Sequence, residues 1–161
     1  MTNKDELRVL TALRAAPFTQ GMESKHIKKL ASIAVEVKFR PDEVIFREGD
    51  EGRAIYLIEE GEIVVESQVA GHGQMTMLTL GPGELLGWSS LFPPRRKTSS
   101  AHAVKPTWAV VIDTDQLQEA FHTDHELETA IIRRVADVIA NRLKATRRHL
   151  VESMTSETRD E

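Results

Sequence analysis

The sequence predicts a mainly β fold, an antiparallel sandwich, roll or barrel, with helices at both ends of the chain. Between residues 35 and 112, short apolar runs of strand length follow one another, and turn signals rich in Gly, Pro and Asp separate nearly all of them. On either side of this segment, apolar residues recur at 3- and 4-residue steps, which is helical spacing. Strands this closely spaced do not fit βαβ units, so we expect antiparallel pairing.

The N-terminal segment, residues 1–34, is expected to hold two helices. Leucines at near-helical spacing within residues 3–15 give the first helix an apolar stripe, and acidic residues occupy its opening turn. A proline and a glycine then interrupt the pattern. Ser24 is the expected N-cap of the second helix, which has its own apolar face.

The β segment is assigned to residues 35–121. Strand-like runs are expected at 35–39, 44–46, 55–58, 63–65, 75–80, 101–104 and 108–112. A short turn or helix should follow the last of them and complete the segment.

Residues 122–154 are predicted to form one long helix. From Glu126 to Met154 the sequence contains no Gly or Pro, and apolar residues such as Ile132 and Ile139 follow 3- and 4-residue steps. Such a stripe can pack against the same stripe of a second copy, as in a coiled coil, so we expect a homodimer through this helix. The polar tail, residues 155–161, is expected to be disordered.

Composition excludes several classes of protein. The net charge of −4 argues against broad nucleic-acid binding, which leaves a basic footprint. No apolar run approaches the roughly 20 residues that span a bilayer, and the acidic N-terminus is unlike a secretory signal. We therefore expect a cytoplasmic protein with no membrane partner. The absence of cysteine rules out disulfides, thiolate metal sites and a cysteine nucleophile.

The histidines do not suggest a metal centre or a catalytic site. Only His122 and His125 lie close together in the sequence, and such a pair beside a helix start is usually exposed. A metalloenzyme of the double-stranded β-helix (cupin) type needs two or three histidines and a carboxylate on its strands, but the expected strands hold only His102. No Ser-His-Asp order stands out. We expect no enzyme activity, no metal and no cofactor.

Residues 81–101 read as a cradle for an anion. A glycine turn leads into a short helical segment, and a proline stop leads into a basic, hydroxyl-rich run that ends on a strand. A helix N-terminus, a guanidinium and hydroxyls are the groups that bind phosphate. Glu84 would repel a phosphate unless a hydroxyl donor such as a ribose 2′-OH lies between them. Alternatively, Glu84 stabilises a helix N-terminus and the basic run is solvated surface charge.

From about residue 18 to 150 the chain resembles the cyclic-nucleotide-binding domain of the catabolite-activator and FNR-type regulators. The turn pattern Gly49-Asp50-x-Gly52, with Tyr56 and Gly61, resembles the early strands of that family, and Gly81-x-Gly83-Glu84 resembles the opening of its phosphate-binding cassette. The resemblance implies an eight-stranded antiparallel β-roll, a jelly-roll-like double-stranded β-helix.

The same resemblance implies a ligand site for cyclic AMP or cyclic GMP. Glu84 would bind the ribose hydroxyl, and an arginine would pair with the cyclic phosphate. Counting back without gaps from Ala103 places Lys97 in the arginine position, whereas one inserted residue places Arg96 there, and we favour Arg96 because its fork suits a phosphate. The remaining residues expected around the ligand in this cassette are Gly83, Leu85, Leu86, Thr98 and Ser99.

The long helix adds two candidate site residues. Arg142 and Thr146 lie in a stretch that resembles the dimer helix of the catabolite activator, where a threonine contacts the adenine amino group. Thr146 is therefore a candidate for reading the base. It could equally be an ordinary position in a helix-helix contact.

The expected function is that of a bacterial signalling module without a DNA-binding domain. Ligand occupancy of the cassette would move the dimer-forming helix, and an effector protein would respond to that movement. The family's regulators carry a winged helix after this helix, which here would need roughly 60 further residues. We therefore expect no direct DNA binding. The alternative is a degenerate dimerisation or scaffold module that keeps the roll and binds no nucleotide.

Overall fold

The computed structural model describes residues 2–157 of the 161-residue chain. The chain divides into two compact units, one ending at His125 and the other starting at Glu126, and we describe each by itself.

Helices begin the chain as the sequence predicts. Their bounds are α1 Asn3–Ala15, the 3-10 helix η1 Pro17–Thr19, and α2 Ser24–Ser32. The prediction that Ser24 caps α2 is wrong, because Glu23 is the N-cap and Ser24 is the first helical residue. The carbonyl of Glu23 accepts the N–H groups of His26 at 3.0 Å and Ile27 at 3.2 Å, which places the helix start one residue earlier.

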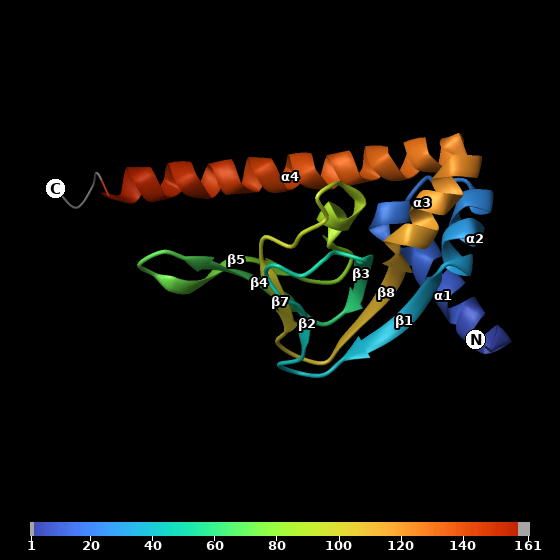
Figure 1. The fold of residues 1–161 in the computed structure, drawn as a ribbon, viewed down its shortest axis with the longest axis horizontal. Helices are drawn as coiled ribbons and strands as arrows, with labels where there is room; N and C mark the ends of the chain where they lie inside the picture. The colour runs from blue at the N-terminus through green and yellow to red at the C-terminus, as the bar shows by residue number, and fades with distance from the viewer. Residues whose placement is uncertain (1, 158–161) are drawn as a thin grey trace. The chain divides into compact units, whose positions relative to one another are not determined.

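Eight antiparallel strands form the roll that the resemblance implies. They are β1 Ala34–Phe39, β2 Val44–Phe46, β3 Ala54–Glu60, β4 Ile63–Val69, β5 Gly73–Leu80, β6 Leu85–Leu86, β7 Ser100–Ala103 and β8 Thr107–Asp113. One sheet has the order β1-β8-β3-β6 and the other has the order β2-β7-β4-β5 (Figure 1). The mainly β fold is confirmed, and seven of the eight strands match predicted runs.

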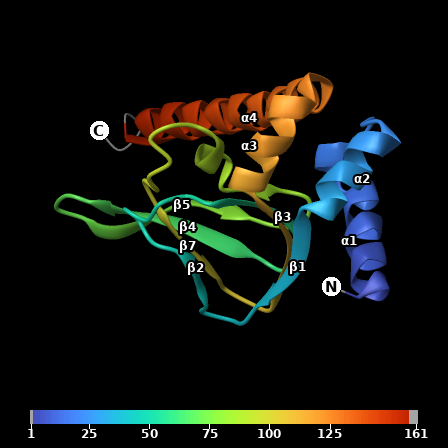
Figure 2. The ribbon, with the colours of Figure 1, turned by 45° about the vertical axis from the view of Figure 1, so that its right-hand side comes forward.

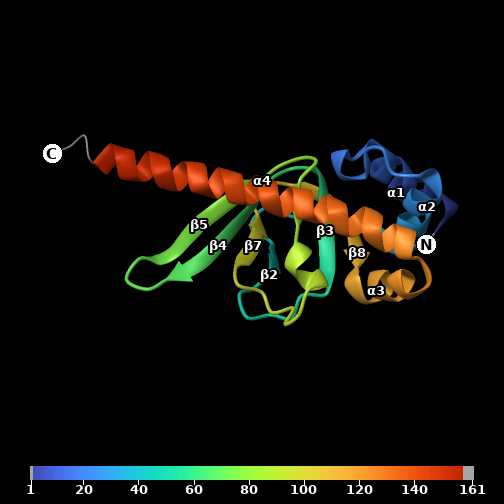
Figure 3. The ribbon, with the colours of Figure 1, turned by 90° about the horizontal axis from the view of Figure 1, so that it is seen from above.

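The core lies between the two sheets. Ile58 from one sheet packs with Ile63 and Leu80 from the other, and all three are at most 2% exposed. A second cluster around Phe39, Ala103 and Ala109 continues this core. The β4–β5 hairpin extends past the rest of the roll in all three ribbon views (Figures 1, 2 and 3). α1 and α2 lie beside β1, at the opposite end of the roll (Figure 2).

Two helices end the described part of the chain, α3 Thr114–Thr123 and α4 His125–Glu157. The long helix starts three residues later than predicted and runs three residues further, so residues 155–157 of the expected disordered tail are helical. Residues 158–161 of that tail lie outside the described residues. In the single chain α4 exposes several large apolar side chains, Leu143, Leu150, Val151 and Met154.

Candidate functional site

The candidate site is the cassette, which we define as residues 81–99 between β5 and β7. Its opening turn is bonded to β3, because the Gly83 N–H donates to the Ile58 carbonyl at 2.7 Å and the Ile58 N–H donates to the Glu84 carbonyl at 3.0 Å. Leu85 and Leu86 then form β6, paired with Leu57 and Tyr56. The start of the cassette is thus fixed to the middle of the roll.

The short helix begins later than the sequence suggests. We expected helical structure directly after Glu84, but Leu85 and Leu86 are extended and 2–3% exposed. Buried backbone groups need hydrogen-bond partners, and β3 supplies them here. A four-residue 3-10 helix, η2 Trp88–Leu91, follows instead.

Gly87 allows the chain to turn between β6 and η2. Its φ of +85° lies in the left-handed region, and a Cβ there would lie 2.9 Å from the Ala54 carbonyl oxygen. The same Cβ would lie 3.4 Å from the Lys97 Nζ. A side chain at this position would therefore disturb both the backbone and the lysine.

Lys97 is the buried cation of the cassette. The residue is only 5% exposed, and its Nζ donates to the Ser90 hydroxyl at 2.8 Å. The ammonium lies 4.3 Å from the centre of the Phe46 ring. Ser90 is itself fully buried, so the Lys97 ammonium is shielded from solvent.

No carboxylate compensates this charge. Within residues 2–157 no acidic side chain lies within ion-pair distance of the Lys97 ammonium. Burial lowers the pKa of Lys97 from 10.5 to about 8, so the amine is still mostly protonated at neutral pH. A buried, unpaired cation is costly, and an anion that pairs with it offsets part of that cost.

Arg96, which the sequence analysis favoured as the phosphate partner, is exposed. Its Nη1 donates to the Gly49 carbonyl at 3.0 Å, on the outside of the roll. The backbone register explains why Lys97 points inward: its N–H donates to the Asp50 carbonyl and its own carbonyl accepts the Gly49 N–H, both at 2.8 Å. Arg96 forms an isolated antiparallel bridge with Glu51, and because successive side chains of such an extended segment face opposite sides, Arg96 points outward when Lys97 points inward.

Glu84 is also exposed. Its Oε2 accepts the N–H of Gly81 at 2.7 Å, within the opening turn of the cassette. The carboxylate therefore closes this turn, and it caps no helix.

The two residues after Lys97 both contact Ser67 of β4. The hydroxyls of Ser99 and Ser67 lie 2.6 Å apart, and the Ser67 hydroxyl donates to the Thr98 carbonyl at 3.3 Å. The Thr98 side chain is exposed and is not engaged by that contact. The second half of the cassette is thus tied to the hairpin.

Arg142 and Thr146 lie on α4, one helical turn apart. The Thr146 hydroxyl donates to the Arg142 carbonyl at 2.9 Å, a contact within the helix. Their expected contact with a ligand stays a prediction.

Sequence reasoning missed three residues, Ser90, Phe46 and Ser67. The ungapped count that places Lys97 in the arginine position was the available signal. With Lys97 in the arginine position, Ser90 lies seven residues before it in the sequence, and in the structure the Ser90 hydroxyl accepts a hydrogen bond from the lysine. Phe46 and Ser67 come from other strands, and no local pattern connects them to the cassette.

Neither a metal cluster nor a membrane span occurs in residues 2–157. No three His, Asp or Glu side chains of this range gather as metal ligands would. None of its helices combines the length and apolarity that crossing a bilayer requires.

Comparison with known proteins agrees with this geometry. The family model "Cyclic nucleotide-binding domain" matches residues 36–124. The chain belongs to this family. It is 30% identical over 141 residues to the CRP-like cAMP-activated global transcriptional regulator of Mycobacterium tuberculosis, covering 87% of this chain and 61% of that protein. It is 28% identical over 141 residues to the cyclic AMP receptor protein of Thermus thermophilus, covering 88% and 60%.

A solved structure supports the fold independently. The chain resembles a cyclic nucleotide-binding domain from Methylobacillus flagellatus with a TM-score of 0.80 at 20% identity, covering 93% of this chain and 84% of that one. The curated relatives are longer, and the chain spans about 60% of their length.

Proposed function

We propose that this chain is a non-enzymatic regulatory module that binds a cyclic nucleotide through its cassette, with Lys97 as the partner of the cyclic phosphate. The observation that carries the proposal is a buried ammonium without a carboxylate partner, in the loop that resembles the family's phosphate-binding cassette. An anion bound there would supply the missing counter-charge. Cyclic AMP and cyclic GMP are the ligands that the family relationship favours.

A lysine changes how the phosphate is held. Arginine offers a rigid, bidentate fork, whereas lysine is a point charge on a flexible stem. Ser90 compensates in part, because its hydroxyl fixes the position of the Lys97 Nζ. We expect Thr98 and Ser99 to add hydroxyl donors, since they follow the lysine directly.

Glu84 would bind the ribose hydroxyl. Its carboxylate is exposed and is held only by the Gly81 N–H, so it can exchange this bond for a ligand hydroxyl without unburying any group. Binding of the ribose is thus expected to loosen the opening turn of the cassette.

The response to the ligand would pass to α4. We propose that two copies of the chain pair through this helix, whose exposed apolar residues Leu143 and Leu150 would then be covered. Arg142 and Thr146 would contact the nucleotide. Because a ligand shifts an equilibrium only by its differential affinity, contacts to both cassette and helix would link occupancy to helix position. The readout would be an effector protein.

Titration calorimetry with cyclic AMP and with cyclic GMP tests the proposal. We expect binding to the wild-type chain and a loss of about 10- to 100-fold in affinity for Lys97→Gln, because a charge-assisted hydrogen bond contributes about 1.5–3 kcal/mol. Arg96→Gln is the matched control: it removes the neighbouring positive charge on the outside of the roll and should change affinity by less than about threefold.

The alternative function is a dimerisation or scaffold module without a nucleotide. The exposed Glu84, already bonded to Gly81, and the replacement of an arginine by Lys97 favour it. Absence of binding of either nucleotide at high micromolar concentration would support this alternative. Equal affinity of the Lys97→Gln and wild-type chains would instead remove Lys97 from the site.

A further inference from the structure

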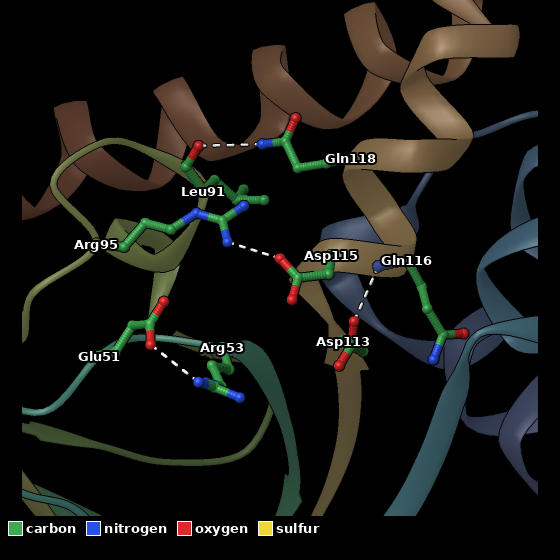
Figure 4. A network of polar contacts seen from close by, with 8 residues as sticks. All are labelled: Glu51, Arg53, Leu91, Arg95, Asp113, Asp115, Gln116 and Gln118. Carbon is green, nitrogen blue, oxygen red and sulfur yellow. Dashed lines mark hydrogen bonds and ion pairs between the residues drawn. The ribbon is translucent and has the colours of Figure 1, made fainter.

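The cassette is attached to α3 at a point that the ligand site does not use. Figure 4 shows Arg95 reaching from the loop after η2 to Asp115 in the first turn of α3. The Arg95 Nη1 lies 2.7 Å from the Asp115 Oδ1, in a geometry that is both an ion pair and a hydrogen bond. These residues are 20 positions apart, so the contact joins two elements that fold from different parts of the chain.

A second contact lies beside the first. The Gln118 side-chain amide donates to the carbonyl of Leu91, the last residue of η2, at 3.2 Å (Figure 4). Residues 115 and 118 lie on one face of α3 because they are three positions apart. One face of α3 therefore holds both the end of η2 and the loop that follows it.

Arg95 is held firmly from its own side. Its φ of +60° is in the left-handed region, which a non-glycine residue enters only when its surroundings determine it. The Arg95 N–H donates to the Phe92 carbonyl at 2.9 Å, and the Arg95 carbonyl accepts the Gly52 N–H at 2.5 Å. The side chain is only 24% exposed, so its direction toward α3 is set by a constrained backbone.

Arg95 also lies two residues before Lys97. The intervening backbone is bonded to residues 49–52, so a displacement of Lys97 by a bound anion must be taken up in this short segment. Within residues 2–157, the ion pair with Asp115 is the one that joins this segment to another element. α3 is the element from which the chain continues into α4.

We propose that Arg95 and Asp115 form a latch that couples the cassette to α3, so that a change at Lys97 is transmitted to the helix preceding α4. The proposed function is needed only for the event that changes the position of Lys97, which is nucleotide binding. The latch itself is a property of the ligand-free chain, and it can be tested without a nucleotide.

Hydrogen exchange of the ligand-free full chain is the first test. If the latch couples the two elements, Asp115→Asn should speed exchange of the cassette amides after Trp88, and Arg95→Ala should speed exchange of the α3 amides. Partly exposed ion pairs contribute little, so about two- to fivefold faster exchange is expected. In each case the affected segment is remote in sequence from the substitution, and a purely local effect would not reach it.

Two control variants separate the latch from general surface charge. Lys105→Ala breaks an exposed ion pair with Glu62, 3.9 Å long, at the end of β8 opposite to α3. Glu119→Gln removes an exposed acidic residue from α3 itself. Neither should change exchange across the interface. The reversed pair Arg95→Asp with Asp115→Arg should restore slow exchange relative to either reversal alone.

The nucleotide adds the second test. We expect cyclic AMP to change exchange in α3 of the wild-type chain, and Asp115→Asn to reduce this change at least twofold while the nucleotide still binds. If the latch variants exchange like the controls in the ligand-free chain, the latch is wrong, whatever the nucleotide does. If calorimetry finds no binding but the ligand-free coupling is present, the proposed function fails and the latch stands.

Discussion

Lys97 is buried and Glu59 is half-buried, and these two ionisable groups of the roll have different neighbours. Lys97, in the cassette, has a serine and an aromatic ring as neighbours and no carboxylate. Glu59, on β3, lies near Glu36, whose negative charge helps to raise the pKa of Glu59, and Arg8 of α1 pairs with Glu36 at 2.8 Å. Within residues 2–157 the buried Glu59 Oε2 has no hydrogen-bond partner. The acidic group therefore has a cation nearby, whereas no carboxylate of residues 2–157 lies within ion-pair distance of the lysine.

Both groups have pKa values shifted toward the neutral form. Burial is the first cause in each case: it lowers the pKa of Lys97 to about 8, and it raises the pKa of Glu59 to about 7 with help from Glu36. Similar shifts thus arise at a proposed ligand site and at a structural contact. The difference lies in the counter-charge, and the following predictions test it.

The largest expected effect is on the pH dependence of nucleotide affinity. A ligand that needs the Lys97 ammonium, with a pKa of about 8 in the free chain, should bind about tenfold more weakly at pH 9 than at pH 7. Calorimetry at both pH values measures this change. Lys97→Arg should remove it, because arginine stays charged over this range. An unchanged affinity of the wild-type chain would mean that the ammonium does not hold the phosphate.

The second effect is on stability. Lys97→Met keeps the length of the side chain and removes the unpaired charge, so the free energy of unfolding at pH 7 should rise by about 1 kcal/mol. The wild-type chain should become more stable as the pH rises from about 8 to 10.5, because the unfolded state then holds more protons than the folded state. Denaturant titrations of both chains measure this. A less stable Lys97→Met chain would contradict the picture of an uncompensated cation.

Glu59 should show the opposite sign. A carboxyl whose pKa rises from 4.5 to about 7 on folding keeps its proton longest in the folded state. The free energy of unfolding should therefore fall as the pH rises from about 4.5 to 7, by on the order of 1 kcal/mol after solvent screening. Glu59→Gln should flatten this part of the stability profile, whereas Glu60→Gln on the same strand should leave most of it in place, because the charge of Glu60 is the smallest of the causes that raise the pKa of Glu59.

The smallest effect is expected at Ser90. Ser90→Ala removes the hydroxyl that positions the Lys97 Nζ and keeps the fold, so nucleotide affinity should fall by about threefold. The lysine pKa, followed by NMR of its side chain, should fall further below its normal value, because a hydrogen bond to the charged form is lost. An unchanged pKa would show that the serine only fills space.

The sequence was sufficient for the roll but not for the direction of side chains in the cassette. Alternating strands and turn glycines predicted seven strands, and the resemblance supplied the eighth, β6, whose two residues are too short for any period to appear. Whether Arg96 or Lys97 points inward depends on hydrogen bonds to Gly49 and Asp50, almost 50 positions away. Counting residues within the cassette does not show how the cassette pairs with residues 49–50, and this pairing decides which side chain points inward.

The close approach of Gly52 to Lys97 has a consequence for engineering. Gly52 lies against Lys97, and an added Cβ there would come within 3.0 Å of the lysine Cε and also collide with the Ser90 hydroxyl. Gly52→Ala would add one methyl group. The substitution changes no charge and removes no hydrogen-bond donor, but the methyl group would displace the Lys97 ammonium. If this displacement prevents nucleotide binding, the variant would be a non-binding control for experiments in cells, with the same charges as the wild-type chain.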